Sequence, residues 1–128
     1  MMLSPRIVIV DDEPSVRSGL SNLLRSEGYD THVFESAEAF LRNEAALADA
    51  SLLIFDVKLK GMSGFDLYRQ LALYPDPPPV IFVSGHGDEN MQWYAINLGA
   101  VTFLRKPINI ETLLEYIRHE LSSREGSR

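Results

Sequence analysis

Cysteine is absent from the 128 residues, so neither a disulfide framework nor a thiolate metal site can form. Basic residues are scarce too: 12 Lys and Arg stand against 18 Asp and Glu, giving a formal net charge of −6. Nucleic acids and anionic membranes are bound through basic surfaces, so we expect direct contact with neither. No hydrophobic run approaches the ~20 residues that a transmembrane helix needs. No signal peptide is evident either, and we therefore expect a cytoplasmic protein.

Short apolar runs rich in β-branched residues recur along the chain and predict five strands. The runs cover residues 7–10, 31–34, 52–55, 80–83 and 101–104. Four to six apolar residues without alternation are typical of strands buried on both faces, as in a parallel sheet covered by helices. The second run is the weakest, so we expect it at an edge of the sheet.

Segments with helical spacing of apolar residues lie between and after these runs and predict five helices. Pro14 suits the first turn of the first helix and Gly28 its end, while Ser36 is a candidate cap of the second. The apolar stripes are Val16, Leu20, Leu23 and Leu24; Phe40 and Leu41; Phe65, Leu67, Tyr68 and Leu71; Met91, Ala95 and Leu98; and Ile110, Leu113, Leu114, Ile117 and Leu121. We expect one domain over residues 1–121, and a polar tail or the start of a linker over residues 122–128.

This alternation predicts an α/β fold, a doubly wound five-stranded parallel sheet with helices on both faces. Crossovers between parallel strands are right-handed. With the strongly apolar first, third and fourth strands in the middle, the expected order is 2-1-3-4-5, which is flavodoxin-like. Ligands of such sheets bind beyond the carboxyl ends of the strands, at the switch point between the first and third.

Acidic, hydroxyl and ammonium groups follow four of the five strands and should share one edge of the sheet. Asp11 and Asp12 follow the first strand, Asp56 the third, Ser84 the fourth and Lys106 the fifth. Two carboxylates about 4 Å apart repel by about 4 kcal/mol at an effective dielectric constant of about 20, so this cluster demands a cation. Since no His or Cys accompanies the acids, Mg²⁺ completed by a phosphate is favoured over Zn²⁺. A carboxylate can itself accept a phosphoryl group.

Four motifs lie in order on these strands. They are residues 7–13 (Ile-Val-Ile-Val-Asp-Asp-Glu), Asp56 with residues 61–64 (Gly-Met-Ser-Gly), residues 83–86 (Val-Ser-Gly-His) and residues 99–107 (Gly-Ala-Val-Thr-Phe-Leu-Arg-Lys-Pro). Together they resemble the receiver domain of a bacterial two-component response regulator over residues 5 to about 121. Residues 84–88 and the context of Phe103 are most similar to the subgroup that carries a C-terminal helix-turn-helix DNA-binding domain.

The resemblance implies a phosphorylation-controlled signalling switch, which is not an enzyme although it assists its own phosphorylation and dephosphorylation. It implies that Asp56 accepts a phosphoryl group from a sensor histidine kinase. Asp11, Asp12 and Asp56 would hold Mg²⁺, Asp12 more directly than Asp11, together with the backbone carbonyl of Lys58. Lys106 would pair with the acceptor carboxylate and then with a phosphoryl oxygen.

The same resemblance implies a conformational relay from the acceptor to the surface. Ser84 would move to hydrogen-bond the phosphoryl group, and Phe103 would swing inward behind it. The peptide bond between Lys106 and Pro107 is expected to be cis. Two residues depart from the family pattern: Lys60 replaces a usual Pro, which makes the loop after the acceptor less stiff, and Ser84 replaces a commoner Thr.

Four further residues are candidates for regulation and binding. Lys58 and His86 are candidates for lining the route of the water that hydrolyses the acyl phosphate. Trp93 and Ile96 fall off the apolar stripe of the fourth helix, which is compatible with a docking patch and equally with partial burial. We expect the fourth helix, fifth strand and fifth helix to form the face for a partner or for a phosphorylation-dependent homodimer that controls transcription.

Three other functions are weighed against this one. A phosphatase of the haloacid dehalogenase type uses Asp-x-Asp at its nucleophile, but residue 58 is Lys, so the acid/base carboxylate is missing. A flavin mononucleotide binder needs a phosphate loop after the first strand, where Asp11 and Asp12 would repel phosphate. A pseudo-receiver, which would be a docking module without phosphorylation, is disfavoured because every required side chain is present. Within the favoured function, a stand-alone receiver that acts through protein–protein interaction remains open, because 128 residues hold no DNA-binding domain.

Overall fold

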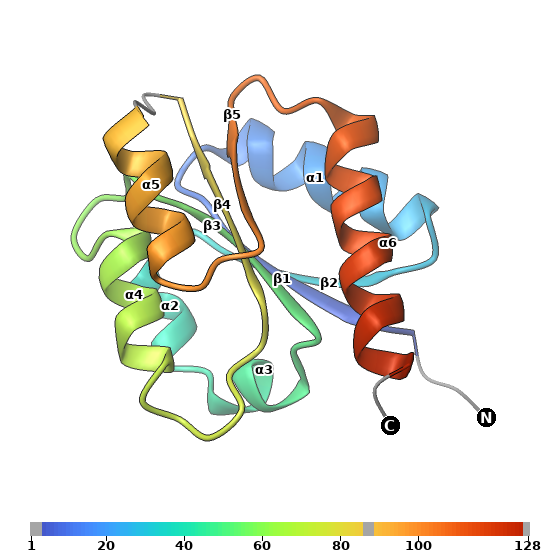
Figure 1. Ribbon diagram of the computed structural model, residues 1–128, viewed down its shortest axis with the longest axis horizontal. Coiled ribbons are helices and arrows are strands. Elements are labelled where there is room, and N and C mark those ends of the chain that lie inside the picture. The colour runs from blue at the N-terminus through green and yellow to red at the C-terminus, as the bar shows by residue number, and fades with distance from the viewer. Residues whose placement is uncertain (1–3, 86–88, 127–128) are drawn as a thin grey trace.

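A five-stranded parallel sheet forms the centre of the computed structural model, which describes residues 4–85 and 89–126 (Figure 1). The strands are β1 (Arg6–Val10), β2 (Asp30–Phe34), β3 (Leu52–Asp56), β4 (Val80–Ser84) and β5 (Thr102–Arg105). All four neighbouring pairs are parallel, and the order is β2-β1-β3-β4-β5. This confirms the predicted fold class and strand order.

Helices cover both faces of the sheet, with α1 and α6 on one side and α2, α3, α4 and α5 on the other (Figure 1). Their bounds are α1 (Pro14–Ser26), α2 (Ala37–Leu41), α3 (Glu44–Asp49), α4 (Gly64–Leu71), α5 (Glu89–Asn97) and α6 (Ile110–Gly126). Pro14 occupies the first turn of α1, and Gly28 follows its end with a φ of +92°. The last helix continues past the final apolar position of its stripe, Leu121, through Gly126.

The prediction of a single helix after β2 is wrong, since two short helices stand in its place. Ser36 caps α2 as expected, its hydroxyl accepting a hydrogen bond from the Ala39 N–H at 3.0 Å. The chain then leaves the helical path at Asn43, whose side chain accepts from the Ala46 N–H at 3.0 Å and so caps α3. A side chain that satisfies the free N–H groups of a new helix makes such a restart favourable.

The core consists of two apolar clusters, one on each face of the sheet. Because successive strand residues point to opposite faces, Ile7 and Ile9 of β1 pack toward α1 and α6, whereas Val8 and Val10 pack toward α2, α4 and α5. All five residues of β3 and of β4 are buried, whereas none of β2 is. Burial therefore follows the predicted arrangement, with central strands apolar and β2 at an edge.

The helices contain no candidate for a membrane span. Over the described part of the chain, none is both long and apolar enough to cross a bilayer.

Candidate phosphoacceptor and metal site

The ends of four strands bring the predicted site residues to one edge of the sheet. The Asp11 N–H bonds the Phe34 carbonyl at 3.1 Å and so continues the β1–β2 pairing by one residue. Asp56 ends β3 opposite Val83 of β4, and Ser84 follows Val83. The Lys106 N–H in turn bonds the Ser84 carbonyl at 2.9 Å. Backbone pairing between neighbouring strands thus aligns these residues.

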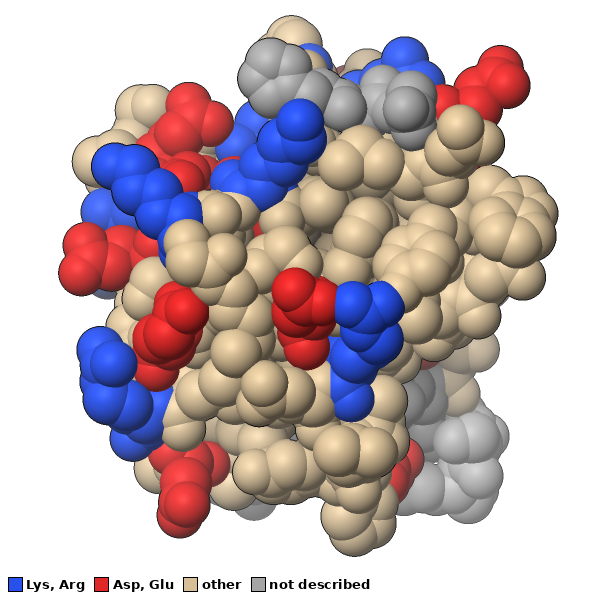
Figure 2. Space-filling view, turned by 90° about the vertical axis from the view of Figure 1, so that its left-hand side faces the viewer, with Lys and Arg blue, Asp and Glu red and all other residues tan. Residues whose placement is uncertain are grey.

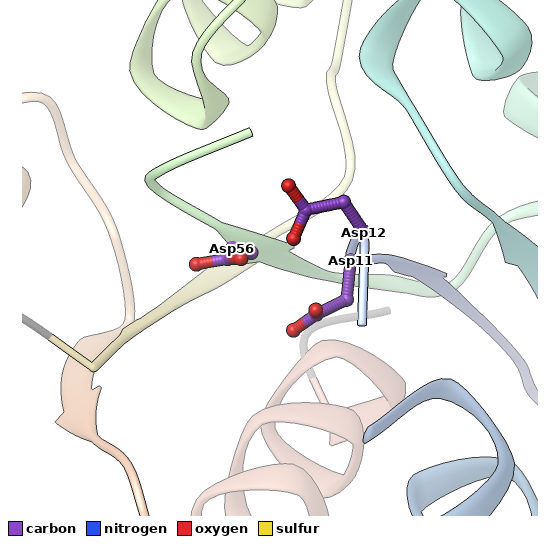
Figure 3. A group of neighbouring side chains, drawn as sticks. All are labelled: Asp11, Asp12 and Asp56. Carbon is purple, nitrogen blue, oxygen red and sulfur yellow. The ribbon is translucent and has the colours of Figure 1, made fainter. Parts of the chain in front are cut away.

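Three aspartates converge at this edge from the ends of β1 and β3 (Figure 3). Asp11, Asp12 and Asp56 each offer a carboxylate oxygen, and these oxygens lie within 4.8 Å of one another. Asp11 is only 1% exposed and Asp56 only 4%, whereas Asp12 is half-buried. Carboxylates this close and this shielded from water repel each other strongly, because little solvent screens their charge.

Lys106 is the cation that contacts this cluster. Its Nζ lies 2.9 Å from Asp11 Oδ2, 2.8 Å from Glu13 Oε1 and 3.4 Å from Asp56 Oδ2. Burial lowers the pKa of the Lys106 ammonium, but the hydrogen bond to Glu13 and the charges of Asp11 and Asp56 outweigh that effect and raise it. Lys106 therefore stays charged at neutral pH. No role for Glu13 was predicted, although its position directly after Asp11-Asp12 is a usable signal.

Asp56 is the carboxylate whose protonation the fold perturbs most clearly. Burial and the charge of Asp11 raise the pKa of Asp56 to about 6, and Lys106 only partly offsets them. The Lys58 N–H donates to Asp56 Oδ1 at 3.3 Å and favours the ionised form. Asp56 is therefore a carboxylate at neutral pH, but one that gains from added positive charge.

The donor set fits a hard divalent cation. Lys106 contacts the carboxylates of Asp11, Glu13 and Asp56, and Asp12 adds a fourth carboxylate beside Asp11 and Asp56, so negative charge is in excess. Within the described residues, the one buried side-chain polar atom without a hydrogen bond is Asp11 Oδ2, whose contact with Lys106 is an ion pair outside hydrogen-bond geometry. Oxygen-only ligands of this kind are those that Mg²⁺ prefers. Asp11, Asp12 and Asp56 could hold the ion.

A glycine allows α4 to start directly against the end of β3. The Gly64 N–H donates to the Val57 carbonyl at 2.9 Å, which brings the start of α4 against the end of β3. A Cβ on Gly64 would lie 2.3 Å from the backbone oxygen of Asp56, far inside contact distance. Ser63 caps α4 by accepting the Asp66 N–H at 3.0 Å. The Gly-Met-Ser-Gly motif thus has a steric reason for its last glycine.

Two of the remaining predicted residues, Ser84 and Phe103, are buried. Ser84 is fully buried and Phe103 is 5% exposed, packed in the cluster beneath α4 and α5. The peptide bond between Lys106 and Pro107 is cis, as expected. His86 lies outside the described residues.

The three other residues singled out from the sequence lie at the surface. Lys58 is exposed. Trp93 and Ile96 project from α5 with exposures of 66% and 49%.

Comparison with known proteins supplies the family. The model of the response regulator receiver domain matches residues 7–118. The response regulator protein TmoT of Ectopseudomonas mendocina is 46% identical over 115 residues, 90% of this chain and 52% of its own. The structure of response regulator StyR aligns with a TM-score of 0.84 and 37% identity, over 98% of this chain and 65% of the other. A signal receiver domain of a Luxo repressor protein from Vibrio parahaemolyticus aligns with a TM-score of 0.88 and 28% identity, over 98% of this chain and 95% of the other.

These matches have one limit and one clear consequence. The chain spans about half the length of the curated relatives it matches first. The family model, however, covers all five strands and most of α6, including every strand end that carries the site. The chain therefore belongs to the family of response regulator receiver domains.

Proposed function

We propose that this chain is a phosphorylation-controlled switch whose phosphoacceptor is Asp56 and whose metal is Mg²⁺. The observation that carries the proposal is the convergence of Asp11, Asp12 and Asp56 at the carboxyl edge of the sheet, with the Lys106 ammonium against Asp11 and Asp56. The phosphoryl donor is the phosphohistidine of a sensor histidine kinase. The family membership supports a donor of this class.

The chain's own residues prepare the transfer by charge and position. An Asp56 carboxylate oxygen attacks phosphorus, the P–N bond to the histidine breaks, and the released imidazole takes up a proton. Lys106 faces the same carboxylate at 3.4 Å and stabilises the negative charge that collects on the transferring oxygens. Asp11, Asp12 and Asp56, with the Lys58 backbone carbonyl, would hold Mg²⁺, which would supply further positive charge there.

The switch works through differential contacts with the added phosphoryl group. Ser84 moves to donate a hydrogen bond to it, and Phe103 occupies the space that Ser84 leaves. Moving the equilibrium between the two conformations, before and after Ser84 and Phe103 move, from 1:99 to 99:1 requires about 5.5 kcal/mol of differential interaction. The new charge on Asp56, together with Lys106 and Mg²⁺, is of the right kind to supply it. Lys58 and His86 tune hydrolysis by lining the route of the attacking water.

The output is transcription regulation through a domain that follows the receiver. The relatives include the C4-dicarboxylate transport transcriptional regulatory protein DctR of Rhodobacter capsulatus, 37% identical over 126 residues. This chain covers 64% of that protein, which leaves room for a C-terminal DNA-binding domain of the helix-turn-helix subgroup. The receiver would act in the cytoplasm, where histidine kinases present their phosphohistidine. Action without an output domain, through protein–protein interaction, is the alternative.

The face formed by α5, β5 and α6 is the proposed contact surface for a second, phosphorylated copy. Figure 2 shows the side on which α4 and α5 lie, where a mostly uncharged area extends above and to the right of the red and blue side chains near the centre. Trp93 and Ile96 of α5 are among the most exposed large apolar side chains described. Aromatic side chains at the centre of an interface carry much of its binding energy.

Replacing Trp93 tests this surface. Trp93→Ala should weaken dimerisation of the phosphorylated protein roughly tenfold, because truncating a central aromatic costs more than about 1 kcal/mol. Light scattering after size exclusion, over a range of concentrations, measures the dimer constant. Leu73→Ala removes an apolar side chain that is 85% exposed but lies outside α5, and it should change nothing. Equal dimerisation of both variants would reject the surface.

Phosphorylation itself is tested with a small-molecule donor. Incubation with acetyl phosphate and Mg²⁺ should add the mass of one phosphoryl group to the intact protein. Asp56→Asn should abolish the gain, because an amide oxygen is a far poorer nucleophile than a carboxylate, and EDTA should suppress it in the unaltered chain. Asp66→Asn, in an exposed aspartate of α4, is the control that should keep the gain. A gain that survives in Asp56→Asn would refute the assignment.

A further inference from the structure

The loop after β3, residues 57–63, connects the acceptor to α4 and has little conformational restriction of its own. Lys60 and Gly61 lack the fixed φ of proline, and Gly61 adopts a φ of +80° that glycine reaches at little cost. Lys58, whose carbonyl is assigned to Mg²⁺ above, lies in this loop. Contacts with other parts of the molecule must therefore hold the loop in one conformation.

Glu38 of α2 makes such a contact. Its Oε2 accepts a hydrogen bond from the Met62 N–H at 2.9 Å, across 24 residues of sequence. A Cβ on Gly61 would lie 2.8 Å from the same oxygen, so the carboxylate rests directly against the loop backbone. Hydrogen bonds from the N–H groups of Met62 and of Glu38 itself lower the pKa of the Glu38 carboxyl. At neutral pH the acceptor is thus a carboxylate, which bonds an N–H more strongly than a neutral group does.

The helix that carries Glu38 is itself firmly fixed to the sheet. Ala37 and Phe40 of α2 are buried, at 0% and 1% exposure. The Phe40 ring packs edge-on against Phe55, with centroids 5.9 Å apart, and Phe55 immediately precedes Asp56 in β3. Glu38 is therefore an anchor whose position is set by the same strand that carries the acceptor.

We propose that Glu38 is a positioning residue, which holds residues 57–63 in the conformation that completes the Mg²⁺ site by accepting the Met62 N–H. The inference rests on the proposed function, because it assigns Glu38 a role in building that site. What matters is that the side-chain oxygen reaches the loop. The negative charge of Glu38 strengthens this hydrogen bond, but an uncharged amide oxygen with the same reach can also accept it.

Two conservative variants separate reach from charge. Glu38→Gln keeps the length and an acceptor oxygen but loses the charge, whereas Glu38→Asp keeps the charge and is one methylene too short. Glu35→Asp makes the same truncation at an exposed neighbour and is the matched control. For each protein, NMR would measure amide exchange at Met62 without metal, and then the affinity for Mg²⁺ alone by titration. Glu38→Ala is a second variant that loses reach, should Glu38→Asp not fold.

Glu38→Asp should lose protection at the Met62 amide and bind Mg²⁺ roughly tenfold more weakly, the scale of effect seen for residues that orient metal ligands. Glu38→Gln and Glu35→Asp should stay within about twofold of the unaltered protein. If the Met62 amide stays protected from exchange in Glu38→Asp, then Glu38 does not hold the loop through this hydrogen bond. Lost protection with unchanged Mg²⁺ affinity would overturn the positioning role, as would weak binding by Glu38→Gln. An unaltered chain that binds no Mg²⁺ would instead refute the proposed function, and this inference with it.

Discussion

Asp56→Asn should make the metal-free protein more stable at pH 7.5, by up to about 3 kcal/mol. The pKa of Asp56 is raised from 3.8 to about 6 in the fold, and each unit corresponds to about 1.4 kcal/mol. A carboxyl with a raised folded pKa binds more protons in the native state than in the unfolded chain. The contribution of Asp56 to stability is therefore greatest below pH 4, falls as pH rises from about 4 to 6, and stays level above. Asparagine removes this loss while keeping the shape of the side chain.

Urea denaturation in EDTA at several pH values measures the effect. The two proteins should differ little at pH 4 and increasingly up to pH 6, with the difference constant at higher pH. Glu35→Gln, an acid-to-amide change at an exposed residue, should show no such trend. Added Mg²⁺ should narrow the gap, since a ligand that binds only the native state stabilises it. A variant that is less stable than the unaltered chain at pH 7.5 would contradict the account.

Gly64→Ala should destabilise the protein by about 3 kcal/mol and weaken Mg²⁺ binding. The new methyl would lie 2.3 Å from the Asp56 carbonyl oxygen and 3.1 Å from Val57 Cα, and both are backbone atoms that cannot rotate away. Relief requires α4 to move off the end of β3. Overpacking of this kind typically costs about 1–3 kcal/mol, and backbone contacts belong at the upper end. The shift would also displace the Asp56 carboxylate.

Gly19→Ala is the matched control for this change. Gly19 lies within α1, and a Cβ there would meet nothing within 4 Å. Alanine favours a helix interior over glycine, so this variant should gain up to about 1 kcal/mol. Denaturant midpoints and Mg²⁺ titrations of the two variants, measured side by side, would show opposite signs of stability change. Equal stability of Gly64→Ala and the unaltered chain would mean that the two elements are less closely packed than described.

The sequence predicted the parts of the fold that depend on pattern. Continuous apolar runs predicted the strands. The strand ends predicted that Asp11, Asp56 and Lys106 lie close together, because the carboxyl ends of parallel strands meet at one edge of the sheet. The break between α2 and α3 was missed, since one capping side chain at Asn43 decides it. Such a local choice between continuing and restarting a helix leaves no periodic signal.

Contacts made by irregular segments could not be predicted from the sequence either. Glu13 meets Lys106 across 93 residues, and Glu38 meets Met62 across 24. Each depends on where two irregular segments come to lie, to within an ångström or so, and no spacing rule encodes that. The site was therefore predictable at the ends of regular elements and unpredictable where loops complete it.

The three-way pairing of Lys106 has a consequence for how quickly the site can respond. Two of its partners, Asp11 and Glu13, do not depend on what Asp56 carries, so the ammonium is already in place before any group arrives. A charge held ready in this way needs no reorientation when new negative charge develops. Lys106 thus provides a fixed positive charge beside Asp56, which can stabilise both the gain and the loss of a negatively charged group there.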